Sequence, residues 1–131
     1  MFRPMLVSGL TIDPLTNSPI VILKEVDGEK TLPIWIGLLE ATAIASELEG
    51  IKFSRPMTHD LLDSVIKSLG ARVERIVIND LRDHVFYATI RLSMNGRTVE
   101  VDSRPSDAIA LGAASNAPIY VADHVFDQTA Q

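Results

Sequence analysis

The sequence predicts a single compact α+β domain, built on a mixed or antiparallel β-sheet with about three helices. Short runs rich in Val, Ile and Leu are separated by Gly, Pro, Asn and Asp, which is typical of strands joined by turns. Other segments repeat their apolar residues at helical spacing. The length of 131 residues suits one domain, which we take to span 1–131 with a polar tail at about 123–131.

Strands are predicted first. Met5–Ile12 and Ile20–Val26 are apolar runs separated by a cluster of turn-forming residues at 13–19. Asp27-Gly28 is a hairpin signal that leads into a third strand, Lys30–Ile36. Apolar residues occupy both alternations of these strands, which indicates burial on two faces.

Two helices follow. The first is predicted at Gly37–Leu48 and ends before Gly50. Its apolar face would contain Leu38, Leu39, Ala41, Ala45 and Leu48. The second runs from Thr58, a suitable N-cap, to Leu69, and Gly70 supplies a left-handed exit. Its apolar stripe would contain Leu61, Leu62, Val65, Ile66 and Leu69.

The second half begins with strands at Val73–Ile78, His84–Met94 and Arg97–Asp102. Asn95-Gly96 is the strongest hairpin signal, and a two-residue loop defines the register of the strands that it joins. The predicted pairs are Met94 with Arg97, Leu92 with Val99, Ile90 with Val101, Ala88 with Ser103, Ser93 with Thr98, Arg91 with Glu100 and Thr89 with Asp102. A third helix of small residues follows at Pro105–Ser115, and Ile119–Val121 is a last strand.

The composition limits the classes of partner. The 12 Lys and Arg residues against 17 Asp and Glu residues give a net charge of −5, which opposes nonspecific binding to phosphates. The absence of Cys excludes disulfides, thiolate zinc sites and a cysteine nucleophile. The uncharged run Ala108–Ala122 is shorter than the roughly 20 apolar residues of a membrane span. We therefore expect a cytoplasmic protein without a membrane segment.

Two segments repeat one pattern. Ser54–Asp60 opens the second helix and Ser103–Asp107 opens the third, and each places Arg-Pro before a hydroxyl residue and an Asp. Free N–H groups at a helix start attract anions, and a neighbouring guanidinium can bind a phosphate or carboxylate. If the two starts meet in one cleft, they form an anion site. Alternatively, Thr58 and Ser106 are helix caps and each Arg bonds a nearby Asp.

His59 and four carboxylates are the candidates for chemistry. An imidazole can transfer protons near neutral pH or bind a metal, although a lone His at a helix start can equally bond a backbone carbonyl. The carboxylates that could hold Mg²⁺ or another divalent cation are Glu40, Asp60, Asp102 and Asp107. Stabilising acids in first helical turns would account equally for all of these except Asp102, which ends a strand. Aromatic residues make up only 5%, so we expect no base-stacking platform.

Four blocks of the sequence together resemble the bifunctional nuclease domain family. They are Leu32–Gly37 with Glu40-Ala41, Arg55–Leu61, Val85–Ala88 and the most distinctive block, Asp102–Leu111. The blocks span nearly the whole chain in the family's order. The chain departs from the family pattern at Gly112–Ser115, where a basic residue is expected late in the helix.

The resemblance implies an α+β fold that forms homo-oligomers, with a dimer favoured, and the hydrolysis of RNA and DNA for which the plant members are named. The positions that match the family's polar motifs are Glu40, Arg55, Thr58, His59, Asp60, Asp102, Arg104, Ser106 and Asp107.

The first functional hypothesis is a nuclease that hydrolyses phosphodiester bonds of RNA, DNA or both with a divalent cation. Its catalytic residues would be His59, Asp102 and Asp107. Its substrate would contact Arg55, Thr58, Arg104 and Ser106. Its cation, Mg²⁺ or another divalent ion, would be held by Glu40, Asp60, Asp102 and Asp107. The alternative is a non-catalytic domain that binds a small anion or a protein partner and forms oligomers through the small-residue helix.

Overall fold

Seven strands form one sheet in a computed structural model that describes residues 1–129. The strands are β1 (Phe2–Ile12), β2 (Pro19–Glu25), β3 (Thr31–Trp35), β4 (Ala71–Arg82), β5 (Val85–Met94), β6 (Arg97–Ser103) and β7 (Ile119–Ala122). The helices of the described residues are α1 (Leu38–Leu48), α2 (Thr58–Ser68), α3 (Pro105–Ser115) and α4 (Asp123–Thr129). The α+β class is confirmed, with four helices in place of about three.

The sheet order is β3-β2-β1-β7-β4-β5-β6. Only β4 and β7 pair in parallel among the described strands, and the other neighbours are antiparallel. The β5–β6 hairpin has the register that the Asn95-Gly96 turn predicts, with every predicted pair present. Both turn residues have positive φ, which is the backbone conformation that this turn requires.

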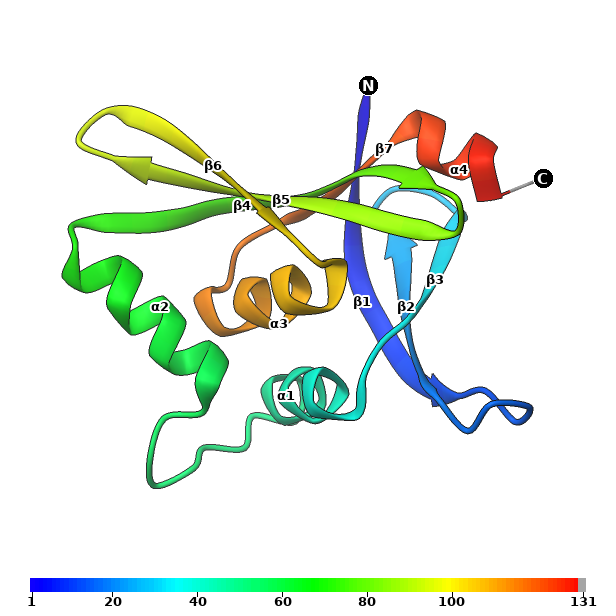
Figure 1. Cartoon of the computed structure of the whole chain (residues 1–131), viewed down its shortest axis with the longest axis horizontal. Coiled ribbons are helices and arrows are strands. Elements are labelled where there is room, and N and C mark those ends of the chain that lie inside the picture. Colours follow the sequence, from blue (N-terminus) through cyan, green and yellow to red (C-terminus); the bar gives the residue numbers. More distant parts are fainter. Residues whose placement is uncertain (130–131) are drawn as a thin grey trace.

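Helix α3 lies at the centre of the helical side of the molecule, between α1 and α2 and against β4 and β5 (Figure 1). Its small side chains permit this close packing, and residues 105–106 and 108–112 are all buried. The fold itself therefore uses most of the surface of this helix, and only Asp107 and the last residues, 113–115, stay at least partly exposed.

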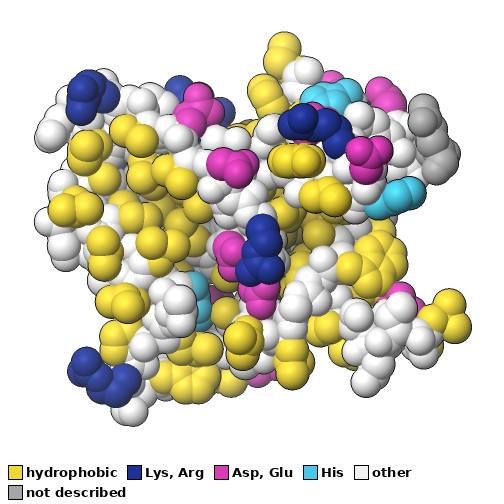
Figure 2. All heavy atoms as spheres, viewed as in Figure 1, with side chains coloured by type: hydrophobic (Ala, Val, Ile, Leu, Met, Phe, Trp, Pro, Cys, Tyr) yellow, Lys and Arg dark blue, Asp and Glu magenta, His cyan; other side chains and the backbone are white. Residues whose placement is uncertain are grey.

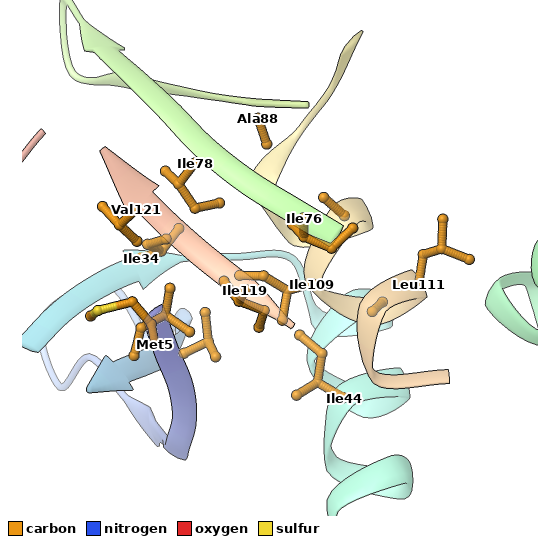
Figure 3. Close-up of a cluster of buried hydrophobic side chains, with 14 of the residues drawn as sticks. Met5, Ile34, Ile44, Ile76, Ile78, Ala88, Ile109, Leu111, Ile119 and Val121 are labelled. Carbon is orange, nitrogen blue, oxygen red and sulfur yellow. The ribbon is translucent and has the colours of Figure 1, made fainter. Parts of the chain in front are cut away.

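The hydrophobic core lies between the sheet and α1 and α3. Side chains from β1, β3, β4, β7 and both helices meet there (Figure 3). Ile44 of α1 and Ile109 of α3 are completely buried in it, as are Ile76 and Ile78 of β4. Polar contacts join the start of α3 to the first turn of α1 and the start of α2 to the last turn of α1.

The predicted apolar faces of α1 and α2 are largely wrong. Leu39 is 81% exposed, and on α2 the buried side chains are His59, Asp63 and Ile66. The exposed hydrophobic residues of α2 and its C-cap are Leu61, Leu62, Val65 and Leu69. Figure 2 shows hydrophobic side chains gathered on the side of the molecule where α2 lies. The sequence periodicity thus marks a surface that this single chain leaves uncovered.

The predicted polar tail is also wrong over the residues that the structure describes. Asp123–Thr129 form α4, in which Val125 and Phe126 are buried. Asp123 anchors the helix start, because its Oδ1 lies 2.8 Å from Arg3 Nε on β1. The last two tail positions, 130–131, lie outside the described residues. None of the described helices is both long enough and apolar enough to cross a membrane.

Candidate functional site

Helix α1 has a carboxylate in its first turn and another in its last turn. Glu40 and Glu47 are seven residues apart, so they lie on nearly the same side of the helix, about 10 Å from each other along its axis. Glu40 contacts the start of α3, whereas Glu47 contacts the start of α2. The two Arg-Pro helix starts therefore belong to two separate polar clusters.

The first group, which we call the histidine cluster, comprises Glu47, His59 and Asp60. His59 Nε2 lies 3.2 Å from Glu47 Oε1 and 3.5 Å from Asp60 Oδ1. The histidine is only 8% exposed, while both carboxylates are half-buried. A buried imidazole thus directs one nitrogen at two carboxylates that reach the surface.

The backbone at the start of α2 fixes Asp60. Asp60 is the third helical residue, and its Oδ2 accepts a hydrogen bond from the backbone N–H of Met57 at 3.0 Å. Met57 is the N-cap residue, so the prediction that Thr58 caps the helix is wrong, and Thr58 is exposed as the first helical residue. With Oδ2 bonded to the backbone, Asp60 presents Oδ1 to His59.

The histidine cluster has donors that suit a divalent cation. One ligand atom from each of its three residues lies within 4.8 Å of the other two. An imidazole nitrogen and two carboxylate oxygens are common ligands of divalent metal ions. Of the predicted metal ligands, only Asp60 belongs to this set.

A pocket of about 350 Å³ adjoins the cluster. Its lining comes from the end of α1, the connection at 49–57 and the start of α2. The lining residues are Ser46, Glu47, Gly50, Ile51, Lys52, Phe53, Arg55, Pro56, Met57, His59 and Asp60. Arg55, predicted to bind substrate, is thus placed beside His59 and Asp60.

The second group, the arginine cluster, comprises Glu40, Arg104, Ser106 and Asp107. Arg104 donates from Nη2 to Glu40 Oε1 at 3.0 Å and from Nε to Asp107 Oδ2 at 2.9 Å. Ser106 Oγ lies 3.4 Å from the same Glu40 oxygen. The hydrogen bond and charge of Asp107, followed by the charge of Glu40, raise the pKa of Arg104. Figure 2 shows acidic and basic side chains together over the start of α3.

The prediction that the two helix starts meet in one cleft is wrong. Arg104 and Ser106 line a different pocket, of about 330 Å³, together with Trp35 and Phe86. Asp102 is exposed on β6 opposite Thr89 and makes no ion pair within residues 1–129. The structure therefore groups Arg55, His59 and Asp60 in one place, and Glu40, Arg104, Ser106 and Asp107 in another.

Sequence reasoning missed Glu47, Lys52 and Phe53. Glu47 is absent from the apolar face predicted for its helix, and it precedes His59 by 12 residues across an irregular connection. No fixed spacing links residues separated by such a connection. A usable signal was the sequence Lys52-Phe53-Ser54-Arg55, which places two cations and an aromatic ring immediately before the predicted helix.

Comparisons with known proteins identify the family to which this chain is similar. The family model described as "Bifunctional nuclease domain" matches residues 21–131. An uncharacterised protein of Mycobacterium tuberculosis is 39% identical over 122 residues, which cover 93% of this chain and 73% of that protein. "Bifunctional nuclease 2" of Oryza sativa subsp. japonica is 26% identical over 86% of this chain and 36% of its own length. "Bifunctional nuclease 1" of Arabidopsis thaliana is 25% identical over 79% of this chain and 33% of its own length.

Proposed function

Because the chain belongs to the bifunctional nuclease domain family, we propose that it hydrolyses phosphodiester bonds of RNA, DNA or both in the pocket beside the histidine cluster. The convergence of Glu47, His59 and Asp60 is the observation that supports this most. A divalent cation held by these residues would polarise the phosphoryl group and acidify a water molecule. This assignment replaces Glu40, Asp102 and Asp107 as metal ligands.

The donor set bears on which cation binds. Mg²⁺ prefers oxygen ligands and retains several waters, whereas an imidazole nitrogen suits transition metals such as Zn²⁺. His59 supplies such a nitrogen, and Glu47 and Asp60 supply the oxygens. We therefore expect Mn²⁺ or Zn²⁺ to bind more tightly than Mg²⁺.

Electrostatics links the divalent metal ion to the two basic side chains of the pocket, Lys52 and Arg55. The two carboxylates of the histidine cluster repel a phosphate, and a divalent cation would neutralise their formal charge. Lys52 and Arg55 then leave the pocket positive, although the chain as a whole is negative. Substrate binding would thus be confined to this place and would depend on the cation.

In the proposed reaction, Arg55 binds the phosphate and Glu47 transfers the proton. Arg55 binds a non-bridging phosphate oxygen and orients the phosphorus. A water oxygen forms a bond to phosphorus, and the bond from phosphorus to the departing sugar oxygen breaks. Glu47 contacts His59 through Oε1, so we assign its Oε2 the proton that the water loses, which then passes to the departing oxygen.

The test compares cleavage of fluorescent single-stranded RNA and DNA by the wild type, His59→Gln and the control His124→Gln, purified identically. His124 lies on α4, outside the pocket. We expect chelation to abolish cleavage, Mn²⁺ to restore it, and His59→Gln to lower it at least 100-fold while His124→Gln retains it. Equal cleavage by all three proteins would show that the pocket is not the active site.

The exposed face of α2 supports a second proposal, self-association. Apolar patches of this kind are typical of protein–protein contacts. We propose that the chain forms a homo-oligomer, with a dimer favoured, through Leu61, Leu62, Val65 and Leu69. A non-catalytic role would use the same surface to bind a different protein.

A further inference from the structure

The connection between α1 and α2 places an unusual combination of side chains at the pocket. Lys52 and Arg55 are exposed cations, and Phe53 between them is 51% exposed. All three line the pocket that His59 and Asp60 also line. Figure 2 shows basic and hydrophobic side chains at the corner of the molecule where this connection runs in Figure 1.

The two cations are available to an anion. Within residues 1–129, neither Lys52 nor Arg55 forms an ion pair, in contrast to Arg104, which is bonded to two carboxylates. Phe53 is similarly free of the hydrophobic core, which includes no residue of the connection. A ring that stays half-exposed beside two unpaired cations is an arrangement that suits a ligand with both a flat apolar part and negative charge.

We propose that this pocket binds an unpaired nucleotide, with a base stacked on Phe53 and the flanking phosphates bound by Lys52 and Arg55. The inference rests on the proposed nuclease function and narrows its substrate to single strands and unpaired ends. Bases within a duplex have neighbours on both faces and offer no face to Phe53. The low aromatic content opposes a platform of several rings, whereas a single base needs only Phe53. Aromatic stacking on unpaired bases is sequence-tolerant, so one pocket can accept both RNA and DNA.

The number of pocket cations also determines how strongly salt should weaken the binding of a single strand. Neutralising two phosphates gives a slope of about −1.4 for the logarithm of affinity against the logarithm of salt concentration on single strands. Duplex-binding proteins with six to ten phosphate contacts have much steeper slopes. A shallow slope is therefore expected here, in keeping with a chain of net charge −5.

Direct binding tests the proposal independently of cleavage. Fluorescence anisotropy would follow a labelled eight-nucleotide DNA single strand and a blunt-ended duplex that contains the same sequence, in Ca²⁺, with the DNA confirmed intact after each run. The variants are Phe53→Leu and Phe53→Trp, and the control is Phe2→Leu. Phe2 is 52% exposed, nearly the same as Phe53, but it lies on β1, outside the pocket.

We expect the wild type, Phe53→Trp and Phe2→Leu to bind the single strand at least tenfold more tightly than the duplex. Phe53→Leu should weaken single-strand binding about tenfold, which is within the range for loss of one stacked base. In Phe53→Trp, the added indole fluorescence should fall on binding. Equal affinity for both DNA forms, or equal loss in Phe2→Leu and Phe53→Leu, would overturn the inference.

The two proposals fail in different ways. Binding that depends on Phe53 without any cleavage in Mn²⁺ would overturn the nuclease function and leave a single-strand binding site. Cleavage that depends on His59 but not on Phe53 would preserve the nuclease function and overturn this inference. A wild type that neither binds nor cleaves would overturn both.

Discussion

At the scale of single residues, several candidate side chains are already hydrogen-bonded to nearby groups, which makes them less available to a ligand. Asp60 accepts a hydrogen bond from its own helix start, and Arg104 is held by Glu40 and Asp107. The arginine cluster is therefore best explained as a clamp between α1 and α3. Arg55 forms no such ion pair within residues 1–129, and the two similar motifs are therefore assigned different roles.

Asp13 and the single Trp offer a test of local electrostatics. Trp35 Nε1 donates to Asp13 Oδ2 at 2.9 Å, and this bond, followed by the backbone N–H of Leu15, lowers the pKa of Asp13 below its ordinary 3.8. A lowered pKa in the folded state means that the contact stabilises the fold above pH 3.8 and is lost as the pH falls through the folded value.

We therefore expect Trp35 fluorescence to titrate with a midpoint below 3.8, and Asp13→Asn to abolish that step. Far-ultraviolet circular dichroism would separate this local change from unfolding. A midpoint at or above 3.8, with the fold intact, would show that the indole does not stabilise the carboxylate.

At the scale of elements, the sequence predicted the turns and helix ends correctly, because these features depend on residues that are adjacent in the chain. The Asn95-Gly96 turn determines its own register, because φ is positive at both positions, and the whole β5–β6 ladder follows from it. The start of α3 at Pro105 and the left-handed Gly70 after α2 are correct for the same reason. Helix faces are different, because burial depends on what packs against a helix, and no local pattern shows that α2 buries His59 and Asp63.

Gly112 tests the packing of α3 against β4. A Cβ at this position would lie 2.9 Å from Cγ1 of Ile76, which is fully buried. Overpacking costs about 1–3 kcal/mol, whereas Ala in place of Gly in a helix gains up to about 1 kcal/mol. We expect Gly112→Ala to lower the free energy of unfolding by about 1 kcal/mol and Tm by about 3 °C.

The control is Gly9→Ala, because a Cβ there would have no neighbour within 4 Å. Thermal unfolding would measure Tm for both variants and for the wild type. A higher Tm for Gly112→Ala than for the wild type would show that α3 is packed less tightly against β4 than the structure indicates.

The proposed self-association depends on one element, because the exposed hydrophobic residues that would form the interface lie on α2 and its C-cap. We expect sedimentation velocity to show an oligomer for the wild type and a monomer for Leu61→Glu with Val65→Glu. Both side chains are about half-exposed, so the two changes should cost the fold of one chain little. The control pair, Leu6→Glu with Ile12→Glu, alters exposed residues of β1 instead. Loss of the oligomer in the control but not in the α2 variant would contradict the proposal.

At the scale of the whole molecule, α1 links the two polar clusters while keeping them apart. The candidate residues other than Asp102 lie at or just before helix starts, as predicted, and Asp102 lies near the end of β6, but the grouping of these residues was not predicted. That grouping depends on α1, whose two ends contact the starts of α3 and α2 respectively. The role of Glu47 could be recognised only from the structure, because its partner His59 lies on another helix. Phe53 is likewise a candidate binding residue only because the structure places it in the pocket beside His59.

Calorimetric titration of the chain with Mn²⁺ tests most directly whether Glu47, His59 and Asp60 form the cation site. We expect one site per chain in the wild type, and at least tenfold weaker binding in His59→Gln and Glu47→Gln. Glu49→Gln, two residues beyond Glu47, and Glu40→Gln and Asp107→Asn, from the arginine cluster, should bind like the wild type. Unchanged Mn²⁺ binding in His59→Gln and Glu47→Gln, with loss in Glu40→Gln or Asp107→Asn, would contradict the account and place the cation at the start of α3.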